Sequence, residues 1–142
     1  MILSSLSKYS DLGLLVLRIV LGAMFMFYGS KILFGGHEKW VQFGQAMGNF
    51  HIHSWPAFWG FMAGFSEFFG GICLILGLFF RPMCLLMAII MIVAARMHFS
   101  KGEGLMGAGH AIEDGVVLFS LIFIGPGKYS LDAWLRSILS LR

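Results

Sequence analysis

The sequence predicts an all-α integral membrane protein, a four-helix bundle with a short interfacial helix after the first span and an amphipathic helix at the C-terminus. The first observation is composition: 58% of the 142 residues are hydrophobic and only 12% are charged, against roughly 25% charged in soluble domains. The second is that four segments each supply the roughly 20 mostly apolar residues that a spanning helix needs. A soluble chain of this length could not bury so much apolar surface, so lipid is the expected solvent.

The predicted spans form a single domain over residues 1–142 and cover about residues 12–34, 55–80, 82–98 and 108–124. Between the second and third spans, Arg81-Pro82 predicts a tight turn, because proline suits the first turn of a helix. The stretch from Lys101 to Gly109 holds four glycines in nine residues and predicts a flexible loop. Gly125-Pro126-Gly127 predicts the end of the fourth span.

Two shorter segments have a one-sided apolar pattern. From Glu38 to Phe50, large apolar residues recur at intervals of three or four, which predicts a short helix lying in the headgroup region; they are Trp40, Phe43, Met47 and Phe50. A second stripe of this kind covers about residues 130–141 after the fourth span. Ser130 is a suitable N-cap for this terminal helix.

Ionisable side chains inside the predicted spans are the most informative feature, because a charge at the bilayer centre costs at least about 2.5–3.5 kcal/mol. Glu67 lies near the middle of the second span, about 18 Å from either end. A carboxylate at that depth has no short route to water, so we expect it to be neutral or paired with a cation. Arg18 lies about 9 Å into the first span and is alone on the cytoplasmic side, where Asp132 of the terminal helix is a candidate partner.

Most of the other buried charge falls in the outer half of the predicted bundle. Cα–Cβ bonds tilt toward the N-terminus of a helix. The second span is predicted to begin on the outer side, so the Glu67 side chain leans toward the outer half. His110 shares a helix face with Glu113 and Asp114, at spacings of three and four residues. Together these positions predict a polar ligand pocket open to the outer side and lined by Lys31, Glu67, Arg96, His98, His110 and Glu113.

Simpler interpretations stand beside this pocket. Charges near helix ends often reach the membrane surface and have no further role, and Arg96 and Glu113 could form a purely structural ion pair. If the buried charges have only a structural role, replacing Glu67 would disturb assembly of the helices and not the binding of a ligand.

Other candidate sites also have simpler explanations. The His51-x-His53 pair could supply two metal ligands, but no third ligand is near in sequence, so no metal site is expected. Cys73 and Cys84 are expected to be free, buried thiols. The Gly60-x-x-x-Gly64 motif and the Gly70-Gly71 pair predict a close helix contact. The sequence has no haem, flavin or iron–sulfur motif, and no basic run of the kind that binds nucleic acid.

Lysine and arginine counts in the loops predict the orientation. The side that holds both termini and the turn after the second span has five of these residues, namely Lys8, Arg81, Lys128, Arg136 and Arg142. The other side has two to four, namely Lys39 and Lys101, with Lys31 and Arg96 if these reach the loops. Both termini are therefore predicted to be cytoplasmic.

A series of short motifs runs along the chain. The first span contains Leu17-Arg18-Ile19-Val20-Leu21-Gly22 and Tyr28-Gly29-Ser30-Lys31, and the second contains Glu67 followed by Gly70-Gly71. Next come Leu76-Gly77-Leu78 and Arg81-Pro82, then Ala94 and His98, and finally Gly125-Pro126-Gly127-Lys128-Tyr129-Ser130-Leu131-Asp132. In this order and spacing the motifs resemble the DoxX family of small four-span bacterial membrane proteins, over nearly the whole chain. The His51-x-His53 pair and Arg96 are not part of this resemblance.

The resemblance implies a four-helix fold in the bacterial inner membrane, and its motif residues include Arg18, Lys31, Glu67 and His98. Members of the family are linked to sulfur and redox metabolism, including a thiosulfate:quinone oxidoreductase and, in mycobacteria, a complex with superoxide dismutase and a sulfurtransferase. The implied function is a membrane subunit of a redox system, serving sulfur or oxidative-stress chemistry, with a quinone as candidate cofactor. Electrons would then come from a partner protein.

Two other functions stay open, and the resemblance does not decide whether the protein is an enzyme. One is a non-enzymatic structural or assembly partner, in which the buried charges only fix helix register. The other is a small proton-coupled transporter that acts as an oligomer, with Glu67 as its proton site. In each case we expect contact with the lipid bilayer and with a protein partner or a second copy, and none with nucleic acid.

Overall fold

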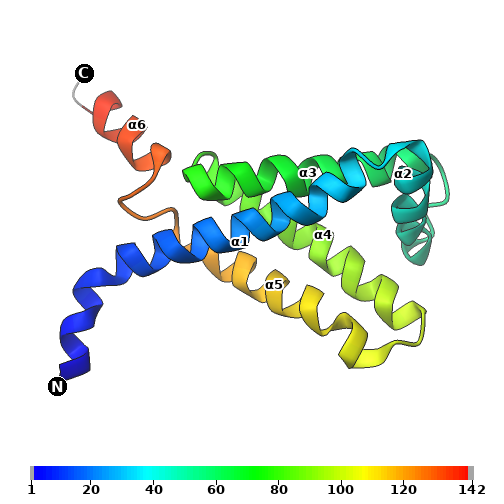
Figure 1. Ribbon diagram of the computed structural model, residues 1–142, viewed down its shortest axis with the longest axis horizontal. Coiled ribbons are helices and arrows are strands. Elements are labelled where there is room, and N and C mark those ends of the chain that lie inside the picture. Colours follow the sequence, from blue (N-terminus) through cyan, green and yellow to red (C-terminus); the bar gives the residue numbers. More distant parts are fainter. Residues whose placement is uncertain (1, 141–142) are drawn as a thin grey trace.

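The computed structural model describes residues 2–140, with side chains from residue 6 onward, and contains only helices and connections over that range. Four long helices make up the bundle (Figure 1): α1 (Ser10–Leu33), α3 (Pro56–Leu76), α4 (Phe80–Ser100) and α5 (Gly104–Ile124). Each is long and apolar enough to cross a membrane. The fold class predicted from the sequence is therefore confirmed.

Four shorter helical segments complete the described chain: η1 (Ile2–Tyr9), α2 (Gly36–Gly44), η2 (Gln45–Phe50) and α6 (Leu131–Leu139). The helix predicted after the first span is thus present as α2 and η2, and it lies across one end of the bundle (Figure 1). Ser130 caps α6 as predicted, because its Oγ accepts a hydrogen bond from the Ala133 N–H at 3.2 Å. Residue 141 and Arg142 lie outside the described residues.

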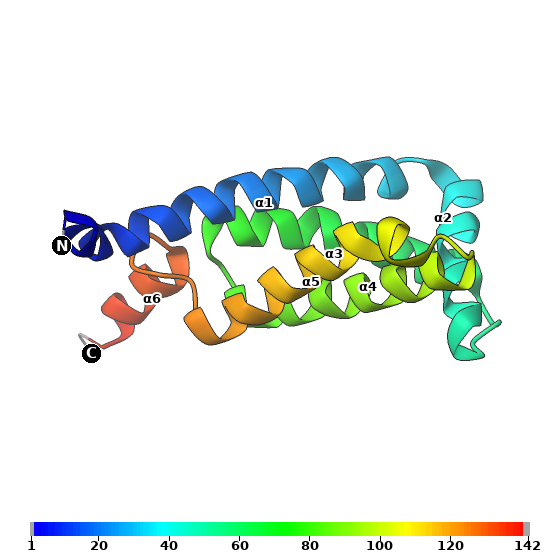
Figure 2. The same cartoon turned by 90° about the horizontal axis from the view of Figure 1, so that it is seen from below.

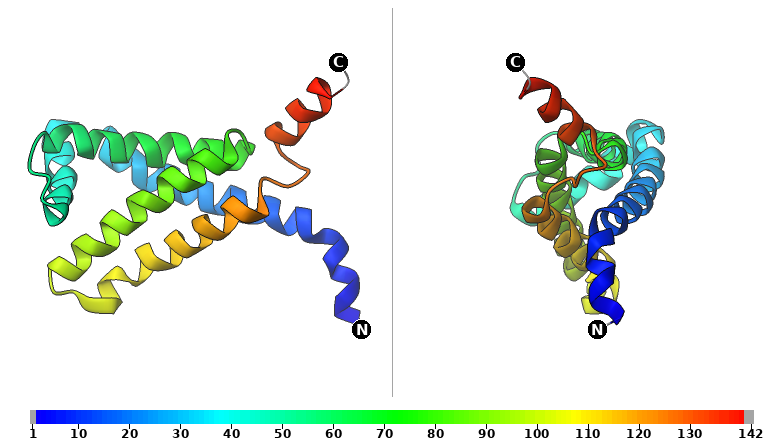
Figure 3. Two further views of the ribbon diagram at one scale, coloured as in Figure 1. Left: turned by 180° about the vertical axis from the view of Figure 1, so that it is seen from behind. Right: turned by 90° about the vertical axis from the view of Figure 1, so that its left-hand side faces the viewer.

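The four long helices form two pairs, with α1 packed along α3 and α4 packed along α5. The pairs diverge toward the end of the molecule that carries α2 (Figures 1 and 3). The described parts of both termini lie at the opposite end (Figure 2). The termini and α2 therefore mark opposite ends of the bundle.

Glycines bring α1 and α3 into close contact. A Cβ on Gly22 would lie 2.6 Å from the backbone oxygen of Gly71, and one on Gly71 would lie 2.5 Å from the backbone oxygen of Gly22. Gly64 lies against Ile32 and Leu33 of α1 in the same way. Because membrane helices have little hydrophobic force to drive them together, small residues that allow close packing matter most. The predicted helix contact is confirmed.

The end of α3 differs from the predicted span. α3 ends at Leu76 rather than near residue 80, because Gly77 adopts a left-handed conformation (φ 65°) and the Leu78 N–H bonds back to the Cys73 carbonyl at 3.0 Å. This is the usual glycine-terminated helix end. Pro82 falls in the first turn of α4, as predicted.

The predicted flexible loop from Lys101 to Gly109 is wrong. Only residues 101–103 separate α4 from α5, and α5 begins at Gly104 rather than near residue 108. The Gly107 N–H already bonds to the Glu103 carbonyl at 3.2 Å. In lipid every backbone polar group needs an internal partner, and this requirement overrides the low helix propensity of glycine.

Candidate functional site

A cavity of about 260 Å³ lies between α1, α3, α4 and α5, in the half of the bundle that carries α2. Its polar lining is concentrated in six side chains, and they are Tyr28, Lys31, Glu67, His98, His110 and Asp114. The rest of the lining is apolar and comprises Phe25, Ile32, Phe43, Met91, Ala94 and Ala111. Four of the six residues predicted to share a pocket thus line one cavity.

Glu67 lies on the α3 side of this cavity. Its side chain is only 7% exposed, and no hydrogen bond or ion pair to it is present within residues 6–140. Gly29 of α1 packs against the Cβ and backbone of Glu67, so the glycine makes room for this residue. The sequence left two states open for Glu67, neutral or paired with a cation, and no cation of the described chain pairs with it.

Two imidazole–carboxylate pairs line the opposite side. His98, near the end of α4, has its Nδ1 hydrogen-bonded to a carboxylate oxygen of Glu103, in the short α4–α5 connection. On α5, His110 Nε2 lies 3.3 Å from a carboxylate oxygen of Asp114, one turn further along the helix. A carboxylate on one ring nitrogen fixes the orientation and tautomer of the imidazole and leaves the other nitrogen available to a ligand.

α1 contributes a cation and a phenol to the lining. The Lys31 ammonium lies 4.0 Å from the centre of the Phe27 ring, a cation–π contact of a kind worth about 0.5–1 kcal/mol at exposed sites. The Tyr28 ring stands edge-on to the His110 ring, with 6.0 Å between the ring centres. Tyr28 and His110 therefore link α1 and α5 across the cavity.

Arg96 and Glu113 do not line this cavity. Both are exposed side chains of the described chain, and they do not form the ion pair considered from the sequence. Rotation about the helix axis separates these two residues from the four that line the cavity. On α5 it is Asp114 that faces inward together with His110, and the spacing of these two residues by four was the signal that favoured it. Tyr28 and Glu103 were not among the predicted pocket residues: Tyr28 stands in the Tyr28-Gly29-Ser30-Lys31 motif but was given no role, and nothing in the sequence singled out Glu103.

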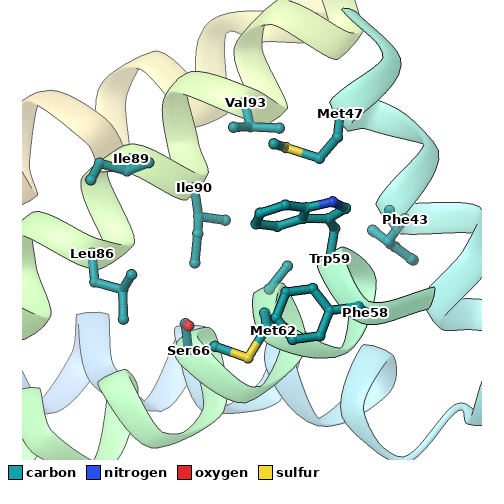
Figure 4. A pocket seen from close by; sticks show the side chains of 12 residues that line it. Phe43, Met47, Phe58, Trp59, Met62, Ser66, Leu86, Ile89, Ile90 and Val93 are labelled. Atoms are coloured by element: carbon teal, nitrogen blue, oxygen red, sulfur yellow. The ribbon is translucent and has the colours of Figure 1, made fainter. Parts of the chain in front are cut away.

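A second cavity, of about 240 Å³, lies between η2, α3 and α4 and is almost entirely apolar. Figure 4 shows Trp59, Met62 and Met47 around it, with Ile90 and Val93 on the α4 side. Its one polar side chain is Ser66, which is 3% exposed and neighbours Glu67 in the sequence. We call this space the apolar groove. Phe43 of α2 lines both the groove and the cavity at Glu67.

Arg18 lies apart from the cavity at Glu67, at the end of the bundle that carries the termini. Its guanidinium is 1% exposed and donates hydrogen bonds of 2.8–2.9 Å to four backbone carbonyls. Two of the carbonyls end α3 and two belong to the connection after α5, and they are those of Leu74, Ile75, Pro126 and Tyr129. The Leu74 carbonyl also accepts a bond of 3.2 Å from the Gly77 N–H. All four carbonyls lie at a helix end or in a connection, where carbonyls have spare acceptor capacity, which explains why a buried cation is stable here.

Asp132 does not pair with Arg18 directly. Its two carboxylate oxygens accept hydrogen bonds from the Phe79 and Phe80 N–H groups, at 3.0 and 2.9 Å, and so cap the start of α4. The Asp132 N–H in turn donates to the Gly77 carbonyl at 3.0 Å. Asp132 thus holds α6 against the α3–α4 connection, beside the carbonyls that Arg18 binds.

Two further pairs of candidate residues come from the sequence, one of histidines and one of cysteines. His51 and His53 are exposed, and no group of three or more potential metal ligands is close together within the described residues. Cys73 and Cys84 are free thiols, as predicted, and Cys84 is fully buried in the core.

A family model for DoxX matches residues 13–100, which is more than half of the chain. The chain belongs to the DoxX family. No curated protein and no solved structure gives a significant match. Together with the four apolar helices, membership of DoxX shows a multi-pass membrane protein.

The DoxX match covers the cavity residues that come from α1, α3 and α4, among them Lys31, Glu67 and His98. It ends at the last residue of α4, so α5 and α6 lie beyond it. The contributions of His110 and Asp114 to the cavity therefore rest on the structure of this chain.

Proposed function

We propose that this DoxX protein is a membrane-embedded subunit of a redox system and that the cavity at Glu67 binds the head group of a quinone. The observation that carries the proposal is Glu67, a residue only 7% exposed that borders a cavity and whose carboxyl has no partner in the described chain. Inside a membrane span, an acid without a partner is costly unless a ligand or water meets it. A ligand that bonds to this carboxyl therefore stabilises the site.

The chemistry of the lining supports an amphipathic ligand with oxygen atoms on its ring. Carbonyl oxygens accept hydrogen bonds from the Tyr28 hydroxyl, the Lys31 ammonium or an imidazole N–H, while a hydroxyl can donate to a carboxylate. Phe25, Met91 and the other apolar residues of the cavity suit the ring itself. Most ligand pockets combine an apolar wall with a few polar groups in this way.

The side chains also supply groups that can hold protons. A quinone carries electrons and protons together when it is bound and reduced. His98, oriented by Glu103, and Glu67 are suited to hold a proton at the head group. His110 is exposed and paired with Asp114, so this pair offers a path between the cavity and the surface. Since the sequence has no haem, flavin or iron–sulfur motif, the proposal assigns electron delivery to a partner protein.

The apolar groove suits the hydrocarbon chain of the same ligand. It is of similar size to the cavity at Glu67, and both are bordered by Phe43. Its walls of Trp, Phe, Met and Ile side chains match an isoprenoid chain in polarity. The groove supports a lipid-soluble quinone over a small polar substrate.

The proposal is tested by equilibrium binding of ubiquinone or menaquinone analogues to the protein in lipid nanodiscs. We expect purified protein to carry quinone, and Glu67→Gln to weaken binding about two- to tenfold, because the amide replaces the O–H donor of a neutral carboxyl imperfectly and a neutral hydrogen bond contributes about 0.5–1.5 kcal/mol. Glu38→Gln is the matched control, since Glu38 is an exposed acid on α2. Protein that is free of quinone and cannot bind added quinone in lipid would overturn the proposal.

A further inference from the structure

Glu113 lies on a surface of α5 that is otherwise suited to lipid. Residues on this surface repeat at alternating intervals of three and four, and the series, here called the α5 seam, is Met106, Gly109, Glu113, Val116, Ser120 and Phe123; all are exposed except Gly109, which is half-buried. The opposite side of α5 packs on α4, where Gly115 approaches Met91. Glu113 therefore points away from the rest of its own chain.

The depth of Glu113 makes its exposure costly. It is nine residues from the start of α5, about 13 Å along the helix axis, and a carboxylate cannot reach the membrane surface from there as a longer side chain can. Acids within membrane spans almost always face a protein neighbour or a water-filled space. We therefore expect the exposed face of α5 to contact a protein neighbour or water at Glu113, and not lipid chains alone.

α4 presents a complementary surface. Its exposed residues follow the same alternation of four and three, and this series, the α4 seam, is Leu85, Ile89, Ile92, Arg96 and Phe99. Arg96 lies four residues before the end of α4, about 6 Å along the axis. It has no ion pair within the described chain. Each seam thus carries one unpaired charge, and the two charges have opposite sign.

The charged groups of Arg96 and Glu113 approach the same depth in the membrane, although their backbones lie at different depths on different helices. The Arg96 side chain leans toward the α4 N-terminus and so deeper into the bundle, whereas the Glu113 side chain leans toward the α4–α5 connection. A second copy of the chain has the same orientation in the membrane, so its Arg96 lies at the level that a neighbour's Glu113 requires. Seams with a seven-residue period are the pattern by which helices interlock side by side.

We propose that the α5 seam of one copy packs against the α4 seam of a second copy, with Glu113 of one bonded to Arg96 of the other. The contact joins different surfaces of the two copies, so it builds a ring where the rotation closes. Gly109 supports close approach, because no atom lies within 4 Å of the position its Cβ would take. A partner of another kind would need its own cation at this depth, whereas a second copy supplies one.

Charge reversal tests this contact with the full chain in native membranes. Two copies with different affinity tags are expressed together, and the amount of one that is recovered with the other is measured. We expect Arg96→Glu and Glu113→Arg each to reduce self-association about tenfold or more, since like charges then meet. When one tagged copy carries Arg96→Glu and the other Glu113→Arg, association should return. Lys101→Glu, in the exposed connection on the same side, is the control and should have no effect.

Three results would overturn the contact: a monomeric wild-type chain, single reversals that associate as the wild type does, or no recovery when the two reversed copies are combined. Should either reversed chain fail to accumulate in the membrane, Arg96→Gln and Glu113→Gln replace them. These neutral variants are expected to weaken association without restoring one another, and unchanged association would contradict the proposal. The proposal is independent of quinone binding, which Glu67→Gln tests alone.

Discussion

Arg18 and Glu67 are both buried, yet their surroundings differ in a way that separates a structural charge from one available to a ligand. Four backbone carbonyls bind the Arg18 guanidinium, so its donors are used within the protein. Glu67 has no such partner in the described chain and borders a cavity. The sequence identified both residues by depth alone, because a charge inside a predicted span is visible without a structure. Their different partners depended on helix ends that only the fold brings together.

Replacing Arg18 tests its structural role. Arg18→Met removes the guanidinium donors from the four carbonyls, and we expect the free energy of unfolding to fall by roughly 3–5 kcal/mol. The measurement is unfolding in mixed detergent micelles. Arg18→Lys should lose somewhat less, because an ammonium has fewer donors and cannot span four carbonyls. Lys101→Met, at an exposed position, should change stability by less than about 0.5 kcal/mol. An Arg18→Met protein as stable as the wild type would contradict the role.

At the scale of elements, the contact between α1 and α3 decides where Glu67 lies. Gly29 on α1 sits directly against Glu67 and Phe68 of α3, and Gly22 sits against Gly71. The glycine motifs of α3 predicted a close contact, but the sequence did not say which helix fills it. That choice depends on the positions of Gly22 and Gly29, seven residues apart on one face of α1.

Adding one methyl group at this contact should move the helices apart. Gly29→Ala places a Cβ into the backbone of α3, and we expect it to destabilise the protein by about 1–3 kcal/mol. Gly13→Ala is the matched control on the same helix, since nothing lies within 4 Å of the added Cβ. It should leave stability unchanged or raise it by up to about 1 kcal/mol, because alanine favours helix. Thermal unfolding in detergent measures both, and equal effects of the two variants would count against the glycine contact.

At the scale of the whole molecule, the two helix pairs meet near the end with the termini, where Arg18 lies, and diverge toward the α2 end (Figure 1), and the cavity at Glu67 lies in the half that carries α2. Four of the six predicted pocket residues line the cavity because hydropathy and depth fix how far each lies along its helix. Arg96 and Glu113 do not, because rotation about a helix axis is set by packing against neighbours. In a span that is apolar around most of its circumference, the hydrophobic pattern does not reveal that rotation.

The orientation in the membrane remains a prediction, and impermeant thiol reagents test it. A bacterial inner membrane with both termini in the cytoplasm places the cavity near the outer surface. Single cysteines at Lys39 and Lys128, in a background without Cys73 and Cys84, report the two ends of the bundle. We expect an impermeant maleimide to label Lys39→Cys in intact spheroplasts and Lys128→Cys only after lysis. The reverse pattern would show that the orientation predicted from the lysine and arginine counts is wrong. The cavity would then open toward the cytoplasm.

Photolabelling with an azidoquinone in lipid nanodiscs tests the central claim, a quinone site at Glu67, most directly. We expect peptide mapping to find the label on residues of the cavity, such as Tyr28, Met91 and His98, and excess unlabelled quinone to remove it. Glu67→Gln should reduce this labelling, and Glu38→Gln should not. Label spread over the lipid-facing surfaces of α1 and α5, with no response to competing quinone or to Glu67→Gln, would contradict the claim.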